Sequence, residues 1–168
     1  DFALAAAAGG QIYGLSEEEI RKGIESLQPV SGRFHIIDTQ RYTIIDDCYN
    51  ANPVSMKASL DILADASGRK VAILGDMGEL GEDQVDMHRE VGVYAASRSI
   101  DVILCVGQLS AYMAEAARFT APAKEILHFS TKEELMKELP QLLKKGDNIL
   151  VKASHFMEFG KILEALQE

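Results

Sequence analysis

The feature that most constrains the fold is a regular alternation of short apolar runs with longer segments of helical periodicity. Runs rich in β-branched residues predict strands at 42–46, 70–74, 101–106, 126–129 and 148–152. The intervening segments predict helices at 53–66, 83–98, 109–119, 131–145 and 155–166. Strands that alternate with helices form a parallel sheet with right-handed crossovers. We therefore expect an α/β fold, a Rossmann-like three-layer domain with a mostly parallel sheet.

Three local features refine this outline. Residues 34–38 and 42–46 predict a hairpin-like pair of strands. Thr131, with Glu134 three residues later, predicts a capping box, and Pro140 predicts a kink or break in the helix that follows.

The first residues read differently, as two helices that precede the alternating part. An alanine-rich stretch, Asp1 to Gly10, ends in the stop signal Gly9-Gly10. Ser16 then caps a second helix with three glutamates in its first turn, and Pro29 closes that helix. An abrupt start inside an apolar helix suggests that this chain belongs to a longer protein.

Composition narrows the possible functions. With 168 residues, 47% of them hydrophobic, the chain can bury one sizeable core. A net charge of −9 argues against partners such as nucleic acid or a membrane surface, because both attract basic faces. Cys48 and Cys105 are expected to be reduced core residues of a cytosolic protein. No cluster of Cys and His has metal-ligand spacing, so we expect no metal site here.

The stretch from Ile44 to Pro53 predicts a strand that turns sharply into a helix. Asn52 suits an N-cap, and Pro53 suits the first helical position because proline lacks an N–H that would be unpaired there. The turn places Asp47, Tyr49 and Asn50 at the carboxyl end of a strand, where open α/β sheets bind ligands. The plainer alternative is a turn whose Asp and Asn side chains only cap the helix.

Other polar strand ends should meet this turn at the same edge of the sheet. They are Asp46, Gly75, Asp76, Gly107 and the segment 152–154. The chain contains neither a Gly-x-x-x-x-Gly-Lys-Thr phosphate loop nor a Gly-x-Gly-x-x-Gly fingerprint. From the residues alone, we expect a nucleotide- or substrate-binding domain that holds half of an active site.

Two motifs carry a resemblance to a known family. Asp-Asp-Cys-Tyr-Asn-Ala-Asn-Pro-Val-Ser-Met-Lys-Ala at 46–58 and Gly-Arg-Lys-Val-Ala-Ile-Leu-Gly-Asp-Met-Gly-Glu-Leu-Gly at 68–81 resemble the Mur ligases. The resemblance implies a C-terminal Rossmann-like domain at residues 31–168, preceded at 1–30 by the helical tail of a central ATP-binding domain. It further implies a bacterial, cytoplasmic, monomeric ligase of peptidoglycan synthesis. The match favours members that join D-alanyl-D-alanine to UDP-N-acetylmuramoyl-tripeptide through an acyl phosphate.

The resemblance also implies roles for individual residues. ATP would be bound here, with magnesium held mainly by the central domain, and no catalytic residue lies in this chain. Arg33 would reach the ribose and phosphates, and Asp47 would bind the ribose hydroxyls. The adenine-side contacts would be Tyr49, Asn50 and Asn52. The substrate-binding residues would be Asp76, His88, Lys152 and Ser154.

The sequence departs from the family pattern at one motif, and some of these residues also have purely structural interpretations. The usual Lys-Gly-Ser-Arg reads Lys152-Ala153-Ser154-His155 here, which puts an anion-binding role of that turn in doubt. Arg33 could instead pair with Asp38, the acidic loop around Asp76 could be solvated, and His88 could be a packed core residue. Two other functions stay open: a different amide ligase of the superfamily, such as a folylpolyglutamate synthase, and a non-catalytic Rossmann-like binding module.

Overall fold

The computed structural model describes residues 8–25 and 34–168, and its centre is a six-stranded sheet in the order β1-β2-β6-β3-β4-β5. The strands are β1 (His35–Asp38), β2 (Tyr42–Asp46), β3 (Lys70–Gly75), β4 (Val102–Val106), β5 (Glu125–Phe129) and β6 (Asp147–Lys152). β1 pairs antiparallel with β2, and each of the other neighbouring pairs is parallel. The predicted hairpin and the mostly parallel sheet are both confirmed.

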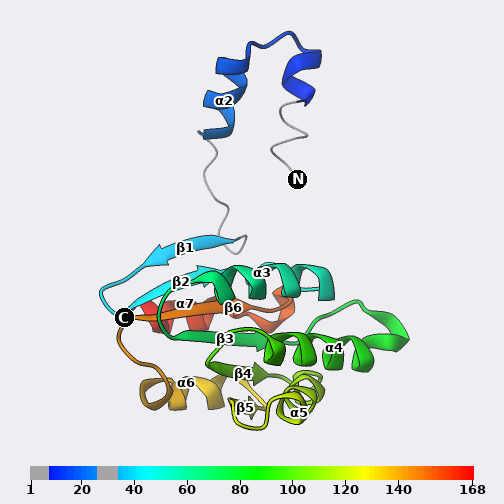
Figure 1. Ribbon diagram of the computed structural model, residues 1–168, viewed down its shortest axis with the longest axis vertical. Coiled ribbons are helices and arrows are strands. Elements are labelled where there is room, and N and C mark those ends of the chain that lie inside the picture. The colour runs from blue at the N-terminus through cyan, green and yellow to red at the C-terminus, as the bar shows by residue number, and fades with distance from the viewer. Residues whose placement is uncertain (1–7, 26–33) are drawn as a thin grey trace.

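Helices cover both faces of this sheet, which makes the three predicted layers (Figure 1). On one face lie α3 (Pro53–Asp65), α4 (Gln84–Ser97) and α5 (Ser110–Thr120). On the other lie α6 (Lys132–Leu142) and α7 (Gly160–Gln167). Two short 3-10 turns, Gly81–Asp83 and His155–Met157, precede α4 and α7.

The strands contribute side chains to two separate hydrophobic cores, because successive side chains of a strand point to opposite faces of the sheet. Ile45, Leu74 and Cys105 pack under α3, α4 and α5. Their chain neighbours Ile44 and Ile73 pack under α6 and α7. Strands buried on both faces explain why the sequence shows continuous apolar runs instead of alternation.

One glycine sets the spacing between α4 and α5. A Cβ atom on Gly92 would lie 2.1 Å from the carbonyl oxygen of Met113, so the backbones of the two helices touch there. Only a residue without a side chain permits this approach, and the two helices consequently form one closely packed block over the sheet.

The N-terminal segment corrects one prediction and confirms another. The first helix continues through Gly9-Gly10 to Ile12, so the stop predicted at Gly9-Gly10 is wrong. The chain turns away after this helix at Gly14, whose φ of +77° allows Leu15 N–H to donate to Gly10 O at 2.9 Å. The predicted cap of α2 (Glu17–Glu25) is present: Ser16 and Glu19 exchange side-chain-to-backbone hydrogen bonds. Pro29 lies outside the described residues.

Two helices near the C-terminus differ from the sequence prediction. α6 continues past Pro140 and ends at Leu142, three residues before the predicted Lys145, and Leu143 N–H donates to Leu139 O. The capping box is incomplete: Glu134 N–H donates to Thr131 Oγ1, but the Glu134 carboxylate accepts from Ser130 N–H.

The last helix begins later in the chain than predicted, and the cause lies in the residues just before it. Predicted from His155, α7 begins at Gly160, because a 3-10 turn and Glu158, with φ +52°, intervene. Within the described part of the chain, no helix combines the length and apolar character needed to cross a bilayer.

Candidate functional site

The polar strand ends do meet at one edge of the sheet, as predicted from the alternating pattern. Ser154, after β6, donates its backbone N–H to Asp76 O at 3.1 Å, and its hydroxyl accepts from Gly78 N–H at 2.8 Å. Lys152, at the end of β6, reaches Asp47 after β2. Segments far apart in the sequence are thereby joined into one surface at the carboxyl edge.

The turn between β2 and α3 has the predicted form. Asn52 accepts a hydrogen bond from Ser55 N–H at 2.9 Å, and the Ser55 hydroxyl accepts from Asn52 N–H at 3.1 Å. Pro53 occupies the first turn of α3. This reciprocal cap fixes the direction in which the chain enters the helix, and with it the positions of Tyr49 and Asn50.

A buried ion pair stands at the centre of this turn. Lys152 is 1% exposed, and its ammonium donates to Asp47 Oδ2 at 2.5 Å, to Asn50 O at 3.0 Å and to Asp47 O at 3.4 Å. An ammonium has three N–H bonds, and these contacts use all of them. The predicted contact of Lys152 with a dipeptide or phosphate would require one of these three hydrogen bonds to break. Its position between Asp47 and Asn50 makes Lys152 a brace for the turn.

Two further donors hold the carboxylate of Asp47. The Ser59 hydroxyl donates to Oδ2 at 2.7 Å, and Phe34 N–H donates to Oδ1 at 3.2 Å. Neither residue was singled out from the sequence. Ser59 lies one helical turn after Ser55, so the pair of serines four residues apart on the first turns of α3 was the available signal.

A pocket of about 440 Å³ opens beside this carboxylate. Its lining includes four of the five residues predicted to bind a nucleotide, together with Lys152 and the residues that sequence reasoning missed. The lining residues are Phe34, Asp47, Tyr49, Asn50, Asn52, Ser55, Ala58, Ser59, Ile62 and Lys152. We call this cavity the elbow pocket. Arg33, the fifth predicted residue, lies outside the described residues.

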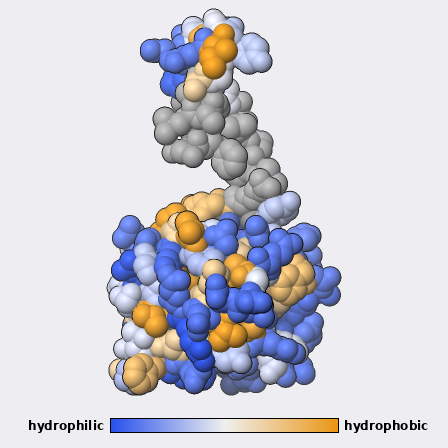
Figure 2. Space-filling view, turned by 90° about the vertical axis from the view of Figure 1, so that its right-hand side faces the viewer, coloured by the Kyte–Doolittle hydropathy of each residue, from blue (hydrophilic) through white to orange (hydrophobic). Residues whose placement is uncertain are grey.

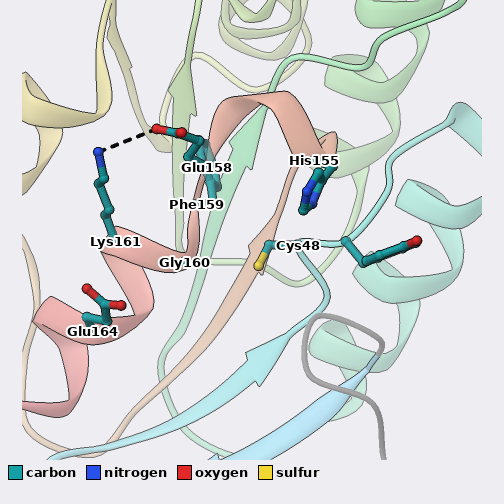
Figure 3. A pocket seen from close by; sticks show the side chains of 8 residues that line it. Cys48, His155, Glu158, Phe159, Gly160, Lys161 and Glu164 are labelled. Atoms are coloured by element: carbon teal, nitrogen blue, oxygen red, sulfur yellow. Dashed lines mark ion pairs between the residues drawn. The ribbon is translucent and has the colours of Figure 1, made fainter.

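Two neighbouring pockets share the ring of Tyr49. One, of about 390 Å³, is lined by Tyr49, Asn50, Gly78, Glu79, Ser154, His155 and Phe156. The other, of about 420 Å³, is lined by Cys48, Tyr49, His155, Glu158, Phe159, Gly160, Lys161 and Glu164. In Figure 3, Cys48 and His155 lie on one side of this second pocket, and Lys161, ion-paired with Glu158 at 3.4 Å, lies opposite. Tyr49 and His155 line both cavities, and the centroids of their rings lie 5.6 Å apart.

Backbone strain is concentrated around these pockets. Among the described residues, the non-glycine residues with positive φ are Phe34 (+52°), Glu79 (+59°) and Glu158 (+52°). Each lines a different one of the three pockets. Such conformations cost energy and persist where the surrounding structure imposes them, commonly at ligand sites.

Asp76 does not line any of these pockets. Its side chain is buried and accepts from Ser110 N–H at 2.7 Å, from Gln108 N–H at 3.0 Å and from the Ser110 hydroxyl. These are the free donors at the start of α5, so Asp76 caps that helix. Gly107 passes directly over the carboxylate, since a Cβ there would lie 2.5 Å from Asp76 Cγ.

His88 is fully buried on α4 and, like Asp76, lines none of these three pockets. Nδ1 lies 2.6 Å from Gln84 O and must donate, while Nε2 accepts from Met77 N–H at 2.9 Å. This assigns the neutral tautomer with the proton on Nδ1. Burial lowers the pKa of His88, which favours the same neutral form. The structure gives His88 a packed position, one of the two readings left open by the sequence.

The surroundings of the site carry charge but no preformed metal cluster. Among residues 8–25 and 34–168, no group of three or more His, Cys, Asp or Glu side chains is placed to hold a metal ion. The two cysteines are free, and Cys105 is a core residue as expected, but Cys48 is only partly buried and packs against the edge of the core. Burial, helped by a hydrogen bond to Asp46, raises the pKa of the Cys48 thiol to about 12. Figure 2 shows one face of the molecule, largely hydrophilic with scattered hydrophobic side chains.

The fold is that of an α/β domain of the Rossmann-like class, with its pockets at the carboxyl edge of the sheet, where such sheets bind ligands. A family profile described as "Mur ligase, glutamate ligase domain" matches residues 32–155. The chain belongs to the Mur ligase family.

Relatives of this chain carry a common description. This chain is 35% identical over 169 residues to the UDP-N-acetylmuramoyl-tripeptide–D-alanyl-D-alanine ligase of Bacillus subtilis. The match covers 99% of this chain and 37% of that relative. A crystal structure of MurF from Acinetobacter baumannii matches with a TM-score of 0.86 at 32% identity, over 98% of this chain and 36% of that one. MurF ligase from Thermotoga maritima in complex with ADP matches with a TM-score of 0.75 at 28% identity, over 95% and 35%. The chain spans little more than a third of the length of these proteins.

Proposed function

We propose that this chain is the C-terminal part of an ATP-dependent ligase that joins D-alanyl-D-alanine to UDP-N-acetylmuramoyl-tripeptide in peptidoglycan synthesis. The proposal rests on membership of the Mur ligase family and on relatives that bear this description over nearly the whole chain. The domain division at residues 1–30 and 31–168, the cytoplasmic location and the monomeric state belong to the proposal as well.

The elbow pocket is the observation that carries the nucleotide part of this proposal. It combines a carboxylate for ribose hydroxyls, amide groups for the edge of a base and the exposed ring of Tyr49. These groups suit adenosine, because an ionised carboxylate only accepts hydrogen bonds whereas an amide both donates and accepts. The capped start of α3 adds the positive end of a helix dipole, which favours the charged part of ATP. Arg33, adjacent in sequence to the pocket residue Phe34, would reach the phosphates.

The two pockets beyond Tyr49 are the proposed places for the incoming dipeptide. Ser154 and Gly78 border one of them, where the Ser154 hydroxyl already accepts a backbone hydrogen bond. In this proposal Asp76 and His88 act on the substrate only indirectly. Asp76 binds the start of α5, and His88 binds the N–H of Met77, the residue that follows Asp76 in the chain. Lys152 acts through Asp47 and Asn50.

The reaction itself needs more than these residues supply. Formation of an acyl phosphate requires a cradle for the terminal phosphates and magnesium. The 168 residues contain no phosphate-loop motif, and the described residues hold no candidate metal cluster. We therefore assign the metal and the transfer step to the part of the relatives that this chain does not span. By itself the chain is expected to bind nucleotide weakly and to make no product.

A nuclear magnetic resonance titration with a non-hydrolysable ATP analogue, and separately with D-alanyl-D-alanine, tests the proposal. We expect the analogue to shift the amides of Asp47, Tyr49 and Asn50, and the dipeptide to shift a distinct set around Ser154. Asp47→Asn should weaken the nucleotide response, whereas the matched acid-to-amide change Asp86→Asn, on the exposed start of α4, should not.

The outcomes separate the alternatives. Nucleotide shifts that map to another face would contradict the assignment of the elbow pocket. Product formation by the isolated chain would contradict the division of labour between its residues and the rest of the ligase. Specific binding of glutamate instead of D-alanyl-D-alanine would favour the folylpolyglutamate synthase-like alternative, and tight binding of an unrelated ligand would favour a non-catalytic module.

A further inference from the structure

The carboxylate of Asp47 is already partly committed within the protein. An ionised carboxylate offers about four acceptor positions, two on each oxygen. Among the described residues, Ser59 and Lys152 both donate to Oδ2, at 2.7 and 2.5 Å, and Phe34 N–H donates to Oδ1 at 3.2 Å. With the donors of the described ranges 8–25 and 34–168 counted, Oδ2 is filled and one acceptor position remains on Oδ1.

From this arrangement we infer that Ser59 is a positioning residue for nucleotide binding, and that Asp47 accepts from a single ribose hydroxyl. The inference rests on the proposed nucleotide site. Ser59 touches no reacting atom; it fixes the rotation of the carboxylate so that Oδ1 faces the elbow pocket. Lys152 neutralises the charge through the same oxygen, Oδ2, and the side chain of Asp47 keeps 17% of its surface exposed for a ligand.

The surroundings of Ser59 support this role. Ser59 is 3% exposed, and its hydroxyl also contacts Ser55 O at 2.9 Å, so the oxygen is held between two acceptors. A hydroxyl has one proton to donate, and the short contact to a charged carboxylate is the stronger of the two bonds. Ser59 therefore couples α3, through its second turn, to the orientation of Asp47 after β2.

The test compares nucleotides that differ only in the ribose. We expect the chain to bind ATP about tenfold more tightly than one of the two analogues, 2′-deoxy-ATP or 3′-deoxy-ATP, as loss of one hydrogen bond to a charged group implies. The other monodeoxy analogue should bind like ATP, and 2′,3′-dideoxy-ATP should lose no more than the weaker monodeoxy form. Equal losses for both monodeoxy analogues, adding in the dideoxy form, would overturn the single-hydroxyl inference.

Ser59→Ala separates positioning from general damage. The variant should bind ATP about tenfold more weakly but bind 2′,3′-dideoxy-ATP as the unaltered chain does, because the lost contact is the one to the ribose. Ser97→Ala is the matched control, since the exposed Ser97 hydroxyl donates only to Tyr94 O in its own helix. An equal loss for ATP and the dideoxy analogue would contradict a positioning role.

A measurement without ligand keeps the inference separate from the proposed function. Phe34 N–H reports on Asp47 Oδ1, so Ser59→Ala should change the amide shift and speed the hydrogen exchange of Phe34, while Ser97→Ala should not. If no nucleotide binds, the proposed nucleotide site fails. The Phe34 amide still decides whether Ser59 orients Asp47: an unchanged amide in Ser59→Ala would overturn that role.

Discussion

Asp47 and Asp76 occupy equivalent places in the molecule, directly after parallel strands at the same edge of the sheet, yet their surroundings differ. Asp76 is 7% exposed, and its partners are the donors at the start of α5. Asp47 lines the elbow pocket and keeps 17% of its side-chain surface exposed. The start of α5 donates to Asp76, whereas the start of α3 is capped by Asn52, so Asp47 is not needed as a helix cap and is the carboxylate proposed for a ligand. Position at a strand end is therefore not sufficient to identify a binding residue.

Of the substitutions that test this comparison, Asp76→Ala should cause the largest loss of stability. It leaves the buried N–H of Ser110 and the partly buried N–H of Gln108 without their acceptor, which should lower the free energy of unfolding by about 3 kcal/mol. Urea unfolding measures the loss. Thr131→Ala, which removes the cap of the more exposed α6, should cost about 1 kcal/mol and serves as the control. Equal losses would show that Asp76 acts as an ordinary surface cap.

Lys152→Met should have a similar or slightly smaller effect. The substitution leaves Asp47 without its buried cation and leaves the carbonyl of Asn50 unpaired, so we expect about 3 kcal/mol of destabilisation. The control is Lys57→Met: the ion pair between Lys57 and Glu90 lies at the surface and should contribute less than about 1 kcal/mol. If both variants lost the same small amount, Lys152 would not brace the turn.

The smallest effect should be the pH dependence contributed by His88. Burial lowers its pKa in the folded chain, so the unfolded chain takes up the proton first. This contribution to stability is complete above the unfolded pKa of about 6.5 and is lost as the pH falls through the folded value. Urea unfolding between about pH 7.5 and about pH 5.5 should show the decline. His88→Gln, which cannot titrate, should show a shallower decline; an unchanged slope would contradict the assignment.

Local chemistry explains what the sequence could predict. The cap at Asn52 and Pro53 is decided within four residues, and the strands were marked by apolar runs that are buried on both faces. Convergence of the strand ends followed from the parallel topology alone. Membership of the Mur ligase family followed from two contiguous motifs.

Long-range contacts explain which features could not be predicted from the sequence. Lys152 meets Asp47 across 105 positions, and His88 meets Met77 N–H from another element. No periodicity reports such pairings. The late start of α7 depends on the left-handed backbone at Glu158, which a residue with a side chain adopts only when its surroundings demand it. The capping of α5 by Asp76 is likewise long-range, because Ser110 lies 34 positions further along the chain.

The environment of the two native thiols has a practical consequence for labelling. Burial raises the pKa of both Cys48 and Cys105 to about 12, so neither forms much thiolate near neutral pH. Because the thiolate is the species that reacts with maleimides and similar dyes, an exposed cysteine introduced elsewhere would react first. Fluorophores for distance measurements can therefore be attached at chosen sites while the native sequence, including the turn around Cys48, stays intact.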